Sequence, residues 1–127
     1  MHCDNLLPMN IAIATDEVRQ FFDAQSRSWD SRTPRNPDVL RSLLAWLPMQ
    51  PGDSVLDVGT GTGVLLPYIR ERNPQGVIDA VDLSPGMLAV AKQKYGTDPF
   101  LHFIPADVTR ESLSRRYHAI LLYSVFP

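Results

Sequence analysis

The chain has 127 residues, of which 44% are hydrophobic and 20% are charged, and its formal net charge at pH 7 is -2. These values are typical of one globular domain with a packed core, and they argue against extensive disorder. The twelve basic residues are scattered along the chain rather than gathered in a stripe. We therefore expect no nucleic-acid partner.

The number of cysteines and the hydropathy of the sequence indicate in which cellular compartment the protein is expected. Cys3 is the single cysteine, which excludes an intrachain disulfide and suits a reducing environment. No apolar run reaches the roughly 18 residues that a membrane helix needs. The N-terminal stretch MHCDNLLPMNIAIATDEV has no basic flank ahead of its apolar patch, so no signal peptide is expected. The sequence predicts a cytoplasmic protein without a membrane partner.

Residues 1–48 predict a helical lead-in. A first helix is expected over 16–28, with its apolar side chains on one face: Val18, Phe21 and Phe22. A second helix is expected over 37–47, with Asn36 as its cap and Pro37 at its first position. Its apolar stripe comprises Val39, Leu40, Leu43, Leu44 and Leu47. The stretch WDSRTPRNP between the two helices predicts a loop.

Short apolar runs alternate with helical stretches over residues 49–127. Strands are expected at 54–58, 77–82, 100–107 and 118–125, and helices at 64–73, 85–95 and near 111–116. Such alternation is typical of parallel strands joined by right-handed crossovers, with both faces of the sheet covered. The expected fold class is α/β, a doubly wound parallel sheet preceded by helices. The lead-in and the sheet make effectively one domain.

Three glycines follow the first strand at every second position, Gly59, Gly61 and Gly63, just after Asp57. Glycine adopts positive φ at little steric cost and lets a ligand approach the backbone. The following helix offers unpaired N–H groups to a polar or anionic ligand, and in such sheets ligands bind beyond the carboxyl ends of the strands. The pattern favours a nucleotide-like ligand. The alternative is a tight turn that only packs a helix against a strand.

The glycine spacing separates two ligand classes. The dinucleotide fingerprint G-x-G-x-x-G needs glycine at 64 or 66, where the chain has Val64 and Leu66. The spacing G-x-G-x-G after Asp57 resembles instead the first motif of the class I S-adenosylmethionine-dependent methyltransferases. VIDAVDLSPGML resembles the second motif of that family, IPADV the third, and YHAILLYSVF its fourth strand. The upstream FFDAQSRSWD resembles, more loosely, a lead-in helix that helps to close the site.

This resemblance covers about residues 18–127 and implies a Rossmann-like fold with S-adenosylmethionine as cofactor. The implied cofactor contacts are Asp57, Gly59, Thr60, Gly61, Gly63, Asp82, Leu83, Met87, Asp107, Val108 and Tyr123. The methionine part would lie at the glycine loop, the ribose hydroxyls at Asp82, and the adenine at the third motif. From the residues alone, Asp82 could instead interact with a helix dipole, Asp107 could cap Thr109, and Tyr123 could be simple packing. Tyr123 and Ser124 would otherwise face the transferring methyl.

Methyl transfer of this kind is an in-line displacement that depends on orientation, so a fixed general base is optional. We therefore assign no catalytic residue. The histidines at 2, 102 and 118 lack metal-ligand spacing, so no metal is expected, and His102 and His118 are predicted to be structural. The ending YSVFP lacks the Asn/Asp-Pro-Pro-Tyr signature of relatives that methylate exocyclic amines of bases or glutamine amides. A small-molecule acceptor is expected.

The resemblance implies a full sheet of seven strands in the order 3-2-1-4-5-7-6. This chain would hold the first four, 3-2-1-4, with strands five to seven missing. The apolar fourth strand would then be an edge, which favours a homodimer or exchange of elements with a neighbour. A truncated chain whose core still folds is a third interpretation. A methyltransferase is the leading function. The alternatives are a non-catalytic S-adenosylmethionine or nucleoside-binding module that acts through oligomerisation or a partner chain, and a nicotinamide-binding half-domain.

Overall fold

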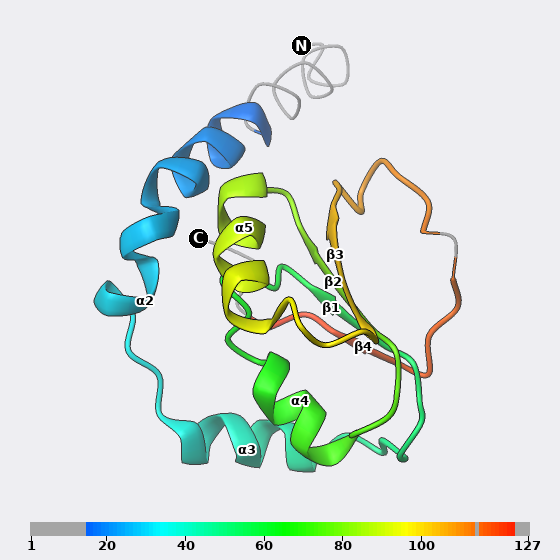
Figure 1. The fold of residues 1–127 in the computed structure, drawn as a ribbon. Coiled ribbons are helices and arrows are strands. Elements are labelled where there is room, and N and C mark those ends of the chain that lie inside the picture. Colours follow the sequence, from blue (N-terminus) through cyan, green and yellow to red (C-terminus); the bar gives the residue numbers. More distant parts are fainter. Residues whose placement is uncertain (1–14, 114, 124–127) are drawn as a thin grey trace, which may run out of the picture.

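The computed structural model describes residues 15–113 and 115–123, and it has an α/β architecture (Figure 1). Four parallel strands form one sheet in the order β3-β2-β1-β4. The strands are β1 (Val55–Val58), β2 (Ile78–Asp82), β3 (Leu101–Pro105) and β4 (Ala119–Leu121). The predicted parallel sheet and its 3-2-1-4 order are confirmed.

The register aligns the carboxyl ends of the inner strands. Asp57 of β1 lies opposite Ala80 of β2 and Leu121 of β4. Parallel pairing therefore brings the loop after β1 and the residue that ends β2, Asp82, to the same edge of the sheet.

Helices cover one face of the sheet (Figure 1). They are α3 (Pro37–Ala45), α4 (Leu66–Arg72) and α5 (Pro85–Tyr95). The start of α5 follows its local sequence, because the side chain of Ser84 accepts a hydrogen bond from the backbone N–H of Met87 and proline occupies the first turn. The core between helices and sheet comprises Leu40, Leu44, Met49, Val55, Leu65, Leu66, Ile69, Ile78, Ala80, Leu101 and Leu121. Burying each large side chain stabilises the fold by about 1.5–3 kcal/mol.

The loop predicted over residues 29–37 is wrong in its first part. The helix that includes residues 15–25 continues through η1 (Ser26–Ser28) and α2 (Trp29–Arg32). The ring of Trp29 packs edge-on against Phe22 with centroids 5.4 Å apart, an aromatic contact that the local sequence does not reveal.

The apolar stripe predicted for the second helix is only half buried. Leu40 and Leu44 lie in the core, whereas Val39 and Leu43 are 51% and 47% exposed. Helix α3 contacts α4, and the outer part of its stripe lines an exposed surface groove with Trp46.

The short helix predicted near 111–116 is not present in the described part of that segment. Its residues are held instead by a buried carboxylate in β2, Asp79, which accepts hydrogen bonds from Arg115 Nε (3.1 Å) and the Tyr117 hydroxyl (2.5 Å). His102 Nδ1 lies 2.9 Å from the same carboxylate. Because side chains alternate along a strand, Asp79 points away from the helices. A non-helical connection therefore lies on this second face.

The buried side chain of Asn73 joins two turns that precede strands. Its Oδ1 accepts from the backbone N–H of Gly52 (2.7 Å) and of Gly76 (3.0 Å), and its Nδ2 donates to the carbonyl of Asp53 (2.5 Å). A Cβ at Gly76 would lie 2.1 Å from that same carbonyl oxygen, so only glycine fits there. The starts of β1 and β2 are thus held together by one amide.

We expect Asn73→Ala to lower the free energy of unfolding by about 2–4 kcal/mol, because three backbone groups, buried or partly buried, lose their partner together. Urea unfolding followed by tryptophan fluorescence measures the change. Gln93→Ala, at an exposed position of α5, is the control and should stay within about 0.5 kcal/mol of the parent. Equal stability of both variants would contradict the role given to Asn73.

Strand β4 forms one edge of the sheet, and the apolar side chains of Ile120 in this strand and of Leu122 just after it are 56% and 65% exposed. Such an edge favours pairing with a second chain. The homodimer expected from the sequence stays a prediction. We expect sedimentation velocity to show a concentration-dependent dimer that Ile120→Lys weakens, since a charge beside the edge opposes pairing. A monomeric parent chain at high concentration would rule this pairing out.

Candidate functional site

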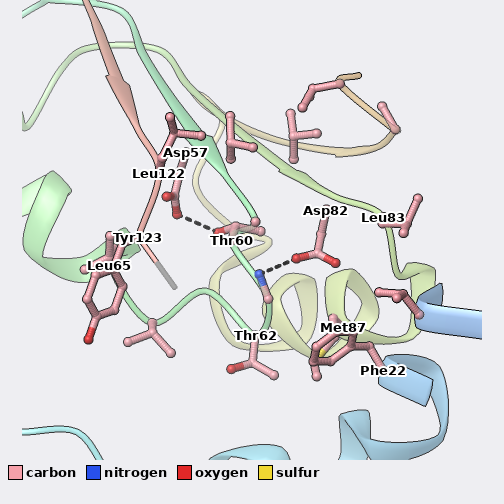
Figure 2. A pocket seen from close by; sticks show the side chains of 18 of the residues that line it. Phe22, Asp57, Thr60, Thr62, Leu65, Asp82, Leu83, Met87, Leu122 and Tyr123 are labelled. Atoms are coloured by element: carbon pink, nitrogen blue, oxygen red, sulfur yellow. Dashed lines mark hydrogen bonds between the residues drawn. The ribbon is translucent and has the colours of Figure 1, made fainter. Parts of the chain in front are cut away.

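A cavity of about 450 Å³ opens at the carboxyl ends of β1 and β2 (Figure 2). Its size lies within the range of small-molecule sites. Its walls come from the loop after β1, the end of β2 with the start of α5, the segments that follow β3 and β4, and the helical lead-in. Most of the predicted site residues line it, namely Asp57, Gly59, Thr60, Gly61, Asp82, Leu83, Met87, Asp107, Val108 and Tyr123.

The glycine loop folds back onto the end of β2. The backbone N–H groups of Gly59 and Thr60 both donate to the carbonyl of Val81, at 2.8 and 3.0 Å. Gly59 and Gly61 have φ of 70° and 59°, which other residue types rarely adopt. A Cβ added at Gly61 would meet no protein atom within 4 Å. The loop therefore leaves open space beside its own backbone.

Gly63 is the one predicted site residue within the described chain that does not line the cavity. Its φ is 85°, and an added Cβ would lie 2.9 Å from Leu66 Cδ1 and 3.0 Å from the ring of Tyr95. This glycine allows close packing of the loop on α4 and α5. At Gly63, the alternative prediction of a tight turn that packs a helix against a strand therefore applies.

Asp82 connects the two strand ends at the mouth of the cavity (Figure 2). Its Oδ2 accepts from the backbone N–H of Gly61 at 2.8 Å, and its Oδ1 accepts from that of Ser84 at 2.9 Å. Burial raises the pKa of Asp82, although these backbone hydrogen bonds oppose the shift; the nearby charge of Asp23 adds to it. The carboxylate lies at the cavity wall with acceptor capacity left for a ligand hydroxyl.

Asp57 is the most deeply buried acid of the cavity, at 1% exposure. Burial raises its pKa to about 7, against a hydrogen bond from Thr60 Oγ1 of 2.8 Å, and the charge of Asp82 adds to the rise. A cationic group placed next to Asp57 would favour its ionised form. This acid is therefore suited to bind a positively charged part of a ligand.

The wall farther along β3 is formed by the predicted third motif. Asp107 lines the cavity, and its Oδ1 also accepts from the backbone N–H and the hydroxyl of Thr109, at 3.0 and 2.5 Å. These contacts with Thr109 lower the pKa of Asp107. The capping role and the cavity position thus coexist. Tyr123 likewise both lines the cavity and packs against the core. Ser124 lies outside the described residues.

The helical lead-in supplies the wall that sequence reasoning assigned to no particular residue. Val18, Phe22, Trp29 and Arg35 line the cavity from this side. In the sequence, only the loose resemblance of FFDAQSRSWD to a lead-in helix indicated this wall. Contacts between the lead-in and the distant sheet residues leave no local sequence pattern.

Two aspartates of the lead-in hold it against the domain. Asp23 Oδ1 accepts from the Ser84 hydroxyl (2.5 Å) and the Gly86 N–H (2.8 Å) at the start of α5. Asp30 accepts from Thr62 of the glycine loop (2.5 Å) and from Lys94 near the end of α5 (2.8 Å). The lead-in is thereby attached to both ends of α5 and to the glycine loop.

The cavity wall contains no histidine in the described part of the chain, and no group of three metal-ligating side chains occurs within 15–113 and 115–123. His102 and His118 lie elsewhere, at Asp79 and at Ser54. No helix in these same residues is long and apolar enough to cross a membrane.

Comparisons with known proteins show the family of the chain. The family described as methyltransferase domain matches residues 55–126. Malonyl-[acyl-carrier protein] O-methyltransferase of Marinomonas sp. (strain MWYL1) is 45% identical over 101 residues, which are 79% of this chain and 37% of that protein. The tRNA1(Val) (adenine(37)-N6)-methyltransferase of Aliivibrio salmonicida (strain LFI1238) is 34% identical over 82 residues, 62% of this chain and 35% of that one.

Among solved structures, a SAM-dependent methyltransferase from Geobacter sulfurreducens in complex with S-adenosyl-L-homocysteine is similar, with a TM-score of 0.61 and 25% identity over 77% of this chain and 41% of that one. The chain thus spans less than half the length of each of these relatives. The family match, the sheet order and the glycine loop lead to one conclusion. The chain belongs to the class I S-adenosylmethionine-dependent methyltransferase family.

Proposed function

We propose that this chain is the cofactor-binding portion of a methyltransferase that uses S-adenosylmethionine. One arrangement carries the proposal: the open backbone at Gly61 and the carboxylate of Asp82 meet at the cavity, joined by a 2.8 Å hydrogen bond. Ribose hydroxyls need such an acceptor, and a nucleoside needs the apolar walls that Leu83 and Met87 provide.

S-adenosylmethionine would supply a methyl group activated by its positively charged sulfur. The contribution of the chain is to hold the donor, to orient it and to exclude water. Asp57 and the loop backbone would hold the methionine end, Asp82 the ribose, and Asp107 with Val108 the adenine. Phe22 and Trp29 of the lead-in would keep the cavity apolar. No general base is required of these residues, because the donor is already reactive.

We propose a small molecule, or a small group on a carrier protein, as the methyl acceptor. The name of the Marinomonas relative, which acts on malonyl-[acyl-carrier protein], supports this class. The tRNA methyltransferase relative offers the competing class, a nucleic acid. The net charge of -2 and the scattered basic residues argue against it. A cytoplasmic location and a division into a lead-in of residues 1–48 and a sheet domain of 49–127 are part of the proposal.

Calorimetric titration of the 127-residue chain with S-adenosylhomocysteine tests the proposal. We expect binding that Asp82→Ala weakens about 10- to 100-fold, because charge-assisted hydrogen bonds to the ribose are lost. Asp82→Asn keeps the shape and should fall between the two. Asp38→Ala, at an exposed site on α3, should bind like the parent chain. A folded parent chain that binds no S-adenosylhomocysteine at millimolar concentration would refute the proposal for this chain.

The raised pKa of Asp57, about 7, predicts a pH dependence. The ammonium group of S-adenosylhomocysteine needs the ionised carboxylate, so we expect affinity to fall about tenfold per pH unit below 7 and to level off above it. Asp57→Asn should bind more weakly and lose this dependence between pH 6 and 8. An unchanged slope in that variant would assign the titration to another group.

The same shift affects stability in the opposite sense. In the unfolded chain Asp57 ionises near its ordinary pKa of 3.8, whereas the folded, ligand-free chain keeps its proton up to about pH 7. The contribution of this group to folding is therefore present at low pH and is lost as pH rises from about 4 to 7. Relative to Asp57→Asn, the stability of the parent chain should decline over that window in urea unfolding.

A further inference from the structure

The half-buried side chain of Arg35 has an unpaired nitrogen at the cavity wall. It lies in the short segment between α2 and α3 and lines the cavity. Its Nε is buried and has no hydrogen-bond partner among the residues that the structure describes. A guanidinium group carries five donors, and a buried donor left unpaired is unfavourable. A satisfying acceptor must therefore come from outside these residues.

Asp30, an acid whose charge interacts with that of Arg35, does not pair with the Arg35 Nε. Both carboxylate oxygens of Asp30 are engaged, Oδ1 by the hydroxyl of Thr62 and Oδ2 by Lys94. Burial alone would raise the pKa of Asp30, but these two hydrogen bonds lower it, and the charge of Arg35 lowers it further. Arg35 is thus close enough to feel this acid, yet no hydrogen bond between them is formed.

Asp57 does not serve Arg35 either. Its recorded side-chain contact in the described chain is the hydrogen bond from Thr60. One cavity is therefore lined by the buried carboxyl group of Asp57 and by the half-buried guanidinium of Arg35, and no hydrogen bond joins the two. A ligand that carries an ammonium and a carboxylate group would satisfy both at once.

We propose that Arg35 is the carboxylate-binding residue of this cavity. The inference rests on the proposed function and extends it to a residue that no motif of the sequence indicates. The planar guanidinium matches a carboxylate with two parallel N–H···O hydrogen bonds, which a lysine cannot reproduce. The carboxylate can belong to the amino-acid end of the cofactor or to an acidic acceptor, and these two sources differ in a binding experiment.

The test compares ligands with and without the carboxylate on the full 127-residue chain. S-adenosylhomocysteine carries the amino-acid group, and 5′-methylthioadenosine is the same nucleoside thioether without it. The variants are Arg35→Met, which keeps the apolar stem, and Arg35→Lys, which keeps the charge. Arg32→Gln is the matched control, since Arg32 is exposed, hydrogen-bonds to Ser28 and Gln25, and lies outside the cavity wall.

If the cofactor supplies the carboxylate, Arg35→Met should weaken S-adenosylhomocysteine about 10- to 100-fold and change methylthioadenosine less than about twofold. Arg35→Lys should recover part of the loss. If the acceptor supplies it, S-adenosylhomocysteine should bind normally, and binding of malonyl-pantetheine to the chain loaded with S-adenosylhomocysteine should be lost. Equal losses for both nucleosides, or no change with any of the three ligands, would overturn the proposal.

A second measurement does not depend on ligand. Removing a guanidinium whose buried Nε is unpaired should leave the ligand-free chain at least as stable, so the urea midpoint of Arg35→Met should equal or exceed that of the parent. A lower midpoint would mean that Arg35 is a structural residue and would overturn the inference. A parent chain that binds neither nucleoside refutes the proposed function itself, whereas normal parent binding with an indifferent Arg35→Met refutes only the role of Arg35.

Discussion

The hydrogen bond from the backbone N–H of Gly61 to Asp82 joins the two segments on which the site depends. The loop after β1 reaches the end of β2 because its glycines adopt positive φ. The carboxylate of Asp82 is partly desolvated there, and backbone N–H groups on both of its oxygens compensate for that burial. This one contact thus depends on the parallel direction of the strands, on the sheet register and on the position of the Asp82 carboxylate. The packed core of β1, β2 and α4 lies behind it.

Two charged side chains line the cavity at positions where they do not stabilise the fold. Asp57 is buried with a single recorded hydrogen bond from a side chain, and Arg35 has an unpaired Nε among the described residues. Outside the cavity, Asn73 and Asp79 have three partners each, although Arg70 Nη2 is also buried and unpaired among the described residues. This contrast is typical of sites where stability is given up for binding.

Local signals made most of the fold predictable. Helix α5 has the predicted bounds because Ser84 and Pro85 mark its start and its connection to β3 is short. The strands were found within a few residues, since apolar runs marked them. Errors arose where distant contacts decide: Trp29 extends the lead-in helix by packing on Phe22, and Asp79 holds Arg115 in a non-helical segment. The position of Arg35 at the cavity also depends on contacts between residues far apart in the sequence, so no sequence motif predicted it.

The strand order has a consequence for how the chain is made. Strand β1 becomes an inner strand when β4 pairs with it, and the first partners, Val55 and Ala119, are far apart in the sequence. At about 5–20 residues per second, synthesis leaves that side of β1 unpaired for about 3–13 s. An apolar strand with a free side invites association with other nascent chains. The negative charge of Asp57 in β1 opposes such association. The carboxylate that is unfavourable to bury in the folded chain therefore lowers the risk of aggregation while the chain is still being synthesised.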